Sequence, residues 1–176
     1  MPGGRRVYII GFMGSGKTTA GKNLAAVLGW PFIDLDKKIE ERAGKSISEI
    51  FSQYGEDHFR MIESETLKSL ENDADAVIAT GGGAPCYADN IDYMLATGLA
   101  IYLKLTPLQL YSRLSESKGE RPLIKNLGKS ELLAFIEEKL HIREPWYNKA
   151  EMKIEGIHID IKNLSTIIKA AFNNRK

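Results

Sequence analysis

Short apolar runs alternate with longer amphipathic segments along this chain. Buried strands are expected at 7–10, 31–35, 76–79, 99–103 and within 151–161. The segments between them predict helices at 17–28, 37–71, 89–97, 130–148 and 164–172, and another that starts at Pro107. Strands that alternate with helices are typical of an α/β domain with a mainly parallel sheet. We therefore expect one such domain over residues 1–176.

Local signals add detail to three of these helices. Ala20, Leu24, Val27 and Leu28 are expected on one buried face of the first helix. The long segment 37–71 is expected to break near Gly44 and Gly55. Ser46 and Glu49 have capping-box spacing, so a helix is expected to begin beside Ser46.

Composition narrows the class of protein. The 176 residues have the length of one domain, with 43% hydrophobic and 27% charged residues. A net charge of +1 disfavours a nucleic-acid partner. No apolar run approaches the roughly 20 residues of a membrane span, and the N-terminus lacks the pattern of a secretion signal. The single cysteine, Cys86, fits a reducing compartment and a packed role, so we expect a cytoplasmic protein without a membrane partner.

The segment Gly11–Thr18 reads G-x-x-x-x-G-K-T, which is the P-loop pattern. Its glycines let consecutive backbone N–H groups face phosphate oxygens, and the helix that follows directs its positive end at the same anion. Lys17 can reach the β- and γ-phosphates, and the Thr18 hydroxyl can bind Mg²⁺. A strand before the motif and a helix after it supply the required context. The motif therefore predicts binding of a nucleoside triphosphate.

Asp34 and Asp36 follow the second strand, where alternate side chains of an extended segment share a face. The carboxyl edge of a parallel sheet is where α/β proteins bind ligands. One carboxylate could serve Mg²⁺ and the other could accept a proton from an acceptor hydroxyl. Taken alone, the pair also fits a helix cap at Asp36, and the P-loop upstream favours the catalytic interpretation.

Three separated arginines and a triple glycine are further candidates for a site. Arg60 with Glu63 has the i,i+3 spacing of an ordinary surface pair, and Arg121 could be a solvated loop residue. An arginine in a mobile loop also suits a phosphoryl-transfer lid, which we expect at about 114–129. Gly81–Gly83 could be a loose turn or could allow close backbone approach to a ligand.

These features occur together in one order: the P-loop, Asp34-Leu35-Asp36, Phe59-Arg60-x-x-Glu63, Gly81-Gly82-Gly83, Arg121-Pro122-Leu123 and Arg143-x-Pro145-x-Tyr147. The set closely resembles the shikimate kinase family over about residues 5–172. The resemblance implies ATP-dependent phosphorylation of the shikimate 3-hydroxyl. It also implies a fold similar to nucleoside monophosphate kinases, with a five-stranded parallel sheet between helices in three α/β/α layers. A substrate-binding helical region is expected at about 36–62.

The resemblance also implies roles for single residues. Nucleotide binding would fall to Gly14, Ser15, Gly16, Lys17, Thr18, Thr19, Arg113 and Arg121. Acceptor binding would fall to Asp36, Arg60, Gly81, Gly82, Gly83 and Arg143, with Glu63 orienting Arg60. The catalytic residues would be Asp36, Lys17 and Arg121, and Mg²⁺ would be held by Thr18 and Asp34. ATP and shikimate are then the expected partners of a monomer.

Other functions remain open at this stage. A related kinase for gluconate or a nucleoside monophosphate would share the P-loop, although Arg60, Arg143 and Asp36 favour a small hydroxy acid. A GTPase switch would need an Asn-Lys-x-Asp element, and Asn148–Glu151 ends in Glu. An inactive relative is a further alternative. The segment 155–161 does not clearly show the family's adenine loop, and the three histidines have no metal-ligand spacing.

Overall fold

A computed structural model describes residues 4–70, 75–116, 124, 127–156 and 158–174. Five strands form one sheet in which every pairing is parallel. Their order across the sheet is β2-β3-β1-β4-β5. The strands are β1 (Arg6–Ile10), β2 (Phe32–Asp34), β3 (Ala76–Ala79), β4 (Leu99–Lys104) and β5 (Met152–Glu155). The predicted five-stranded parallel sheet is therefore confirmed.

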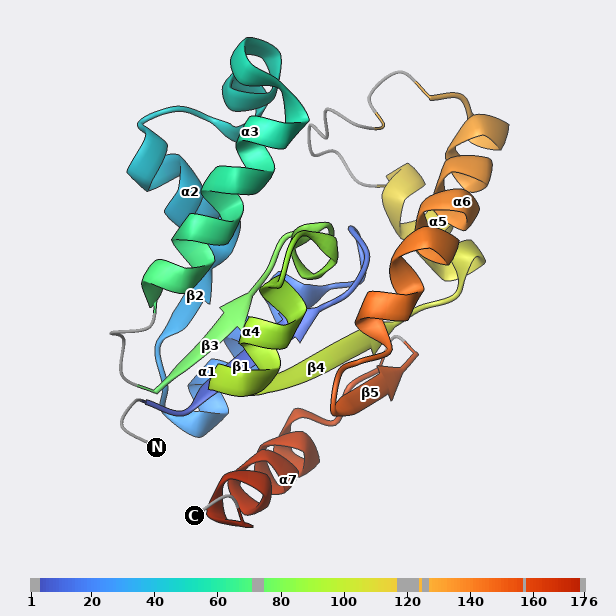
Figure 1. The fold of residues 1–176 in the computed structure, drawn as a ribbon. Coiled ribbons are helices and arrows are strands. Elements are labelled where there is room, and N and C mark those ends of the chain that lie inside the picture. The colour runs from blue at the N-terminus through green and yellow to red at the C-terminus, as the bar shows by residue number, and fades with distance from the viewer. Residues whose placement is uncertain (1–3, 71–74, 117–123, 125–126, 157, 175–176) are drawn as a thin grey trace.

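Helices cover both faces of this sheet (Figure 1). They are α1 (Lys17–Leu28), α2 (Leu35–Ala43), α3 (Ile47–Ser69), the short 3₁₀ helix η2 (Ala84–Cys86), α4 (Asn90–Thr97), α5 (Pro107–Glu116), α6 (Lys129–Tyr147) and α7 (Ile161–Asn174). Figure 1 shows the α2–α3 pair and the α5–α6 pair rising on opposite sides of one end of the sheet. Within the described ranges, no helix has both the length and the apolar character that crossing a bilayer requires.

The strand β1 shows why the fold has three layers. Its side chains alternate, so Tyr8 and Ile10 join one hydrophobic cluster while Val7 and Ile9 join the other. The cluster around Val7 includes residues of α1 and α7, and the cluster around Tyr8 includes residues of α3, α4, α5 and α6. Both faces of a parallel sheet are thus buried, as its continuous apolar strands require.

Two details predicted from the sequence pattern are wrong. Val27 was expected on the buried face of α1, but it is 43% exposed, and Ala25 is buried there instead. The second strand ends at Asp34 because Leu35 already begins α2. Asp36 therefore lies in the first turn of a helix and not in an extended segment beside Asp34.

The helix α3 carries the acceptor-side candidates, and two local devices fix its path. The Ser46–Glu49 capping box is present, as predicted, with the Ser46 side chain accepting from the Glu49 amide. Gly55 interrupts the helix with φ 83° and ψ 176°, a conformation that is essentially limited to glycine. Arg60 and Glu63 lie on the segment after this kink, so its direction places both side chains.

We predict that Gly55→Ala lowers the free energy of unfolding by about 1–3 kcal/mol, because a Cβ is strained at this φ and ψ. Urea denaturation measures the change. Ser52→Ala, at an exposed position less than one turn earlier in the same helix, is the control and should change stability by less than about 0.5 kcal/mol. Equal stability of Gly55→Ala and the wild type would contradict the strained kink.

Candidate active site

A cleft of about 850 Å³ lies where the carboxyl ends of β1, β2 and β3 meet the helices. Its volume is typical of sites for small molecules and cofactors. It gathers most of the residues singled out in the sequence: Gly14, Gly16, Lys17, Thr18, Thr19, Asp34, Asp36, Arg60, Gly81, Gly82, Gly83, Arg113 and Arg143. Segments that are far apart in the chain therefore meet in one cavity. Arg121 lies outside the described residues.

The P-loop forms the floor of this cleft on one side. Gly11, Gly14 and Gly16 all have positive φ, at 143°, 80° and 92°. This backbone leads directly into α1, whose first residue is Lys17. The Lys17 ammonium donates to the carbonyls of Gly11 at 2.9 Å and Phe12 at 2.8 Å. The loop is thus held around its own lysine, at the helix end that favours an anion.

Ser15 differs from the other residues of the loop. It is only 4% exposed, and it does not line the cleft. Its amide donates to the Phe12 carbonyl at 3.2 Å. Its hydroxyl is buried and has no hydrogen-bond partner in the described part of the chain. Ser15 therefore shapes the turn from beneath.

Two polar groups flank the P-loop. A guanidinium nitrogen of Arg113 donates to the Gly14 carbonyl at 3.3 Å, and it would lie 3.0 Å from a Cβ placed at Gly16. On the other side, the Thr18 hydroxyl donates to Oδ2 of Asp34 at 3.3 Å. A cation thus lies beside the phosphate loop, and a hydroxyl–carboxylate pair lies at the start of α1.

Asp36 faces the same cleft from the first turn of α2. Burial raises the pKa of its carboxyl, and the nearby charge of Asp34 raises it further. Lys17 and Arg60 act in the opposite direction and favour the ionised form. A carboxylate with a raised pKa is a stronger base than an exposed one, and two cations help to keep it charged.

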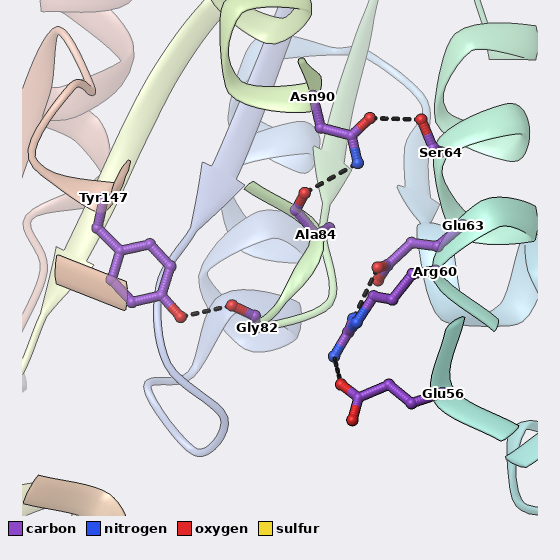
Figure 2. Close-up of polar contacts among 8 residues, drawn as sticks. All are labelled: Glu56, Arg60, Glu63, Ser64, Gly82, Ala84, Asn90 and Tyr147. Carbon is purple, nitrogen blue, oxygen red and sulfur yellow. Dashed lines mark hydrogen bonds and ion pairs between the residues drawn. The ribbon is translucent and has the colours of Figure 1, made fainter. Parts of the chain in front are cut away.

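Arg60 is held between two carboxylates (Figure 2). One terminal nitrogen donates to Glu63 at 2.7 Å and the other donates to Glu56 at 3.1 Å. The guanidinium packs so closely on Gly83 that a Cβ there would lie 2.3–2.6 Å from its atoms. Glycine at this position therefore gives Arg60 its place beside the cleft.

Glu63 is the most buried charged residue of the site, with 0% of its surface exposed. Its Oε2 accepts from Arg60, whereas Oε1 has no hydrogen-bond partner in the described residues. Oε1 would lie 2.5 Å from a Cβ at Gly81, and the same Cβ would meet Asp36 at 3.2 Å. Burial raises the pKa of Glu63 to about 7, against the attraction of Arg60. The sequence showed the spacing of Arg60 and Glu63, but it did not predict that Glu63 would be fully buried.

Arg143 completes the acceptor side from α6. Its guanidinium carbon lies 5.6 Å from the centre of the Phe12 ring, and one of its nitrogens would lie 3.6 Å from a Cβ at Gly82. Tyr147, one turn later, is fully buried and donates its hydroxyl to the Gly82 carbonyl (Figure 2). In the sequence, Tyr147 was noted only as one position of a motif. Its hydrogen bond to Gly82 shows that it connects α6 to the glycine loop.

Asn90 is a second structural residue that the sequence did not single out. It is fully buried, accepts from the Ser64 hydroxyl at 2.6 Å and donates to the Ala84 carbonyl at 2.9 Å (Figure 2). These two bonds join α3, η2 and the start of α4 beside Gly81–Gly83. No local sequence pattern indicates such a long-range polar bridge.

A P-loop before the first helix of a parallel α/β sheet binds nucleotide phosphates, and the opposite wall carries a carboxylate and two arginines. Fold and cleft together define a P-loop phosphotransferase whose cleft has a second half lined by a carboxylate and two arginines. The shikimate kinase family model matches residues 13–171. The chain therefore belongs to the shikimate kinase family, whose members are phosphotransferases with an alcohol acceptor and use ATP as co-substrate.

Individual proteins agree with this assignment. The chain is 46% identical over 152 residues to a shikimate kinase of Parabacteroides distasonis, covering 86% of this chain and 88% of that one. A crystal structure of shikimate kinase from Bacteroides thetaiotaomicron matches with a TM-score of 0.87 at 36% identity, over 96% and 98% of the two chains. Shikimate kinase from Acinetobacter baumannii in complex with shikimate matches with a TM-score of 0.82 at 33% identity, over 98% and 95%.

A gluconokinase from Sinorhizobium meliloti has a TM-score of 0.61 at 14% identity, covering 98% of each chain. At that identity the likeness concerns the fold alone. It gives no support to gluconate as the acceptor of this chain.

The buried carboxyl of Glu63 predicts a pH dependence of stability. Its pKa is about 7 in the folded state and 4.5 as its ordinary value, so the native state binds this proton more tightly than the unfolded state. The free energy of unfolding should therefore fall as the pH rises from about 4.5 to about 7. Relative to Glu63→Gln, which does not titrate, the wild type should lose about 1–3 kcal/mol over this range.

Urea denaturation of both proteins at pH 4.5, 6 and 8 measures this difference. A constant offset between the two proteins carries no information, because the substitution also changes the hydrogen bond to Arg60. Only the slope with pH reports the titration. Parallel curves would contradict a buried carboxyl that gains its proton near neutral pH.

Proposed function

We propose that this chain transfers the γ-phosphoryl group of ATP to the 3-hydroxyl of shikimate and releases ADP and shikimate 3-phosphate. One observation carries the proposal. Arg60 and Arg143 lie beside the glycine loop on the acceptor side of a cleft whose other side is a P-loop. Two guanidinium groups suit a carboxylate that must be held in a fixed orientation. The shikimate complex of the Acinetobacter baumannii relative supports the same acceptor.

Asp36 is proposed as the base for the acceptor hydroxyl. It lines the same cleft as Lys17 and Arg60, and the charges of both act on its carboxyl, which supports a position near both substrates. In the proposed step, the hydroxyl oxygen bonds to the γ-phosphorus while Asp36 takes the hydroxyl proton. The bond from the γ-phosphorus to the β,γ-bridging oxygen breaks, and ADP leaves.

The phosphate side is proposed to stabilise charge and to fix alignment. The backbone N–H groups of Gly14–Thr19 and the Lys17 ammonium would hold the phosphates. Arg113 is proposed to contact the nucleotide, and its hydrogen bond to the Gly14 carbonyl supports this role. Arg121 is proposed as a lid arginine on the transferred group. Positioning and charge stabilisation supply most of the catalysis in phosphoryl transfer.

Mg²⁺ is proposed to bind with ATP at Thr18 and Asp34. The donor chemistry fits, because a hydroxyl and a carboxylate oxygen lie 3.3 Å apart and Mg²⁺ prefers hard oxygen ligands. Among the residues the structure describes, no group of three or more His, Cys, Asp or Glu side chains could hold a metal. Mg²⁺ in kinases typically has one or two protein ligands and completes its shell with phosphate oxygens and water. When bound, it would neutralise charge on the phosphates.

The test measures ADP release with Mg-ATP against shikimate, quinate, gluconate and nucleoside monophosphates. ADP release that depends on shikimate is expected, with shikimate 3-phosphate identified by mass spectrometry. Slow ADP release that no acceptor increases would indicate a nucleotide-dependent switch. Preference for gluconate or a nucleotide would contradict the proposal.

We predict that Asp36→Asn lowers kcat for shikimate phosphorylation by ~10²-fold or more, because the amide cannot take the hydroxyl proton. Steady-state kinetics with both substrates measures the loss, and circular dichroism checks the fold. Asp92→Asn is the control. Asp92 is an exposed carboxylate on α4 that pairs with Lys149, and its substitution should leave kcat unchanged. Near-normal turnover of Asp36→Asn would contradict the assignment of Asp36 as the base.

A further inference from the structure

Both terminal nitrogens of Arg60 already have carboxylate partners. One donates to Glu63 at 2.7 Å and the other donates to Glu56 at 3.1 Å. Yet the proposed function requires this guanidinium to bind the carboxylate of an incoming acid. A carboxylate that binds the same two nitrogens in two-pronged geometry would compete with these internal partners. One of the two internal carboxylates must therefore be replaceable.

The two carboxylates differ in their surroundings. The Glu63 side chain is 0% exposed and packs beside Gly81 and Asp36. The Glu56 side chain is 54% exposed and directly follows the kink at Gly55. An ionised Glu56 can leave Arg60 and be hydrated at once, whereas Glu63 would pay a large desolvation cost in any unpaired position.

A second cavity supplies room for this movement. It has a volume of about 340 Å³ and meets the main cleft at Arg60, Gly83 and Arg143. Glu56 lines this second cavity but not the main cleft, and Lys139 of α6 also lines the second cavity. The guanidinium of Arg60 thus separates two spaces, with Glu63 facing the cleft and Glu56 facing the second cavity.

We propose that Glu56 is a displaceable counter-ion, which neutralises Arg60 in the empty enzyme and yields its hydrogen bond to the carboxylate of the acceptor. The inference rests on the proposed function. Glu56 is then a specificity-determining residue that acts through Arg60. A negative acceptor replaces one ion pair with another, whereas a neutral acceptor cannot take the place of Glu56 and leaves the Glu56–Arg60 pair intact. Only anionic acceptors therefore gain the contact with Arg60, and the binding of each is weakened by the strength of the displaced pair.

Glu56→Gln tests the proposal, because the amide removes the competing charge with little change in shape. KM for shikimate should fall about two- to fivefold, which corresponds to the strength of an exposed ion pair, while kcat and KM for ATP stay unchanged. Glu65→Gln is the matched control. Glu65 lies on the same helix, its side chain is 55% exposed, and it pairs with Arg42 at 3.3 Å. This control should leave all three constants unchanged.

The methyl ester of shikimate gives a second readout, since it keeps the ring and hydroxyls but carries no charge. Isothermal titration calorimetry should show tighter binding of shikimate to Glu56→Gln, and no gain for the ester. In an Arg60→Ala background, Glu56→Gln should give no gain for shikimate either, because the effect passes through that guanidinium.

Three results would overturn the inference. A KM for shikimate that is unchanged or raised in Glu56→Gln would mean that Glu56 does not compete, or that it supports Arg60. An equal gain in Glu65→Gln would indicate a general effect of surface charge. An equal gain for the ester would exclude exchange of carboxylates. Absence of shikimate phosphorylation by the wild type would instead overturn the proposed function, so the two failures are distinguishable.

Discussion

The buried ion pair between Arg60 and Glu63 is the constraint on which the acceptor half of the cleft depends. Removing one partner from such a pair typically costs about 3–5 kcal/mol, because the remaining charge stays buried. The surrounding backbone must therefore fit both groups closely. Gly83 leaves room for the guanidinium, Gly81 leaves room for the carboxyl, and the kink at Gly55 directs the helix segment that carries them.

Both halves of the cleft are organised by internal contacts that resemble those a ligand would make. Lys17 binds two carbonyls of its own loop, and Arg60 binds two carboxylates. Arg113 contacts the Gly14 carbonyl. Each of these cations thus has an internal partner beside the cleft, and a buried cation with such a partner is less costly than one that is wholly unpaired. Ligand affinity then reflects the difference between the new contacts and those that are replaced.

The sequence predicted those parts of the fold that local patterns determine. The strands and α1 follow from apolar runs and from the P-loop, and the break at Gly55 follows from a single glycine. Asp36 shows the limit of such patterns. The alternation of only two residues, Asp34 and Asp36, fits the end of a strand as well as the first turn of a helix. The sequence therefore did not predict that Asp36 lies in a helix. Val27 was misplaced because a helical face several residues wide does not define which edge positions meet the core.

The part of the candidate site that the sequence did not predict consists of contacts between distant segments. Asn90 bridges α3 and η2, and Tyr147 reaches the glycine loop from α6. Neither residue type signals such a role in its local sequence, because a buried amide or hydroxyl is informative only once its partners are known. The roles of Arg60, Arg143 and Asp36 came from a resemblance over the whole chain. Their proximity in the fold is consistent with those roles, which remain predictions.

The triple glycine shows how contacts rather than backbone angles can select a residue. Gly81, Gly82 and Gly83 all have φ values outside the left-handed region, so another residue could adopt their backbone. A Cβ at Gly81 would displace Glu63, one at Gly82 would press on the Met13 amide at 3.2 Å, and one at Gly83 would displace Arg60. The three positions thus fix the buried carboxyl, the phosphate loop and the guanidinium relative to one another. Since an in-line reaction needs both substrates in one alignment, this loop sets the register between the two halves of the cleft.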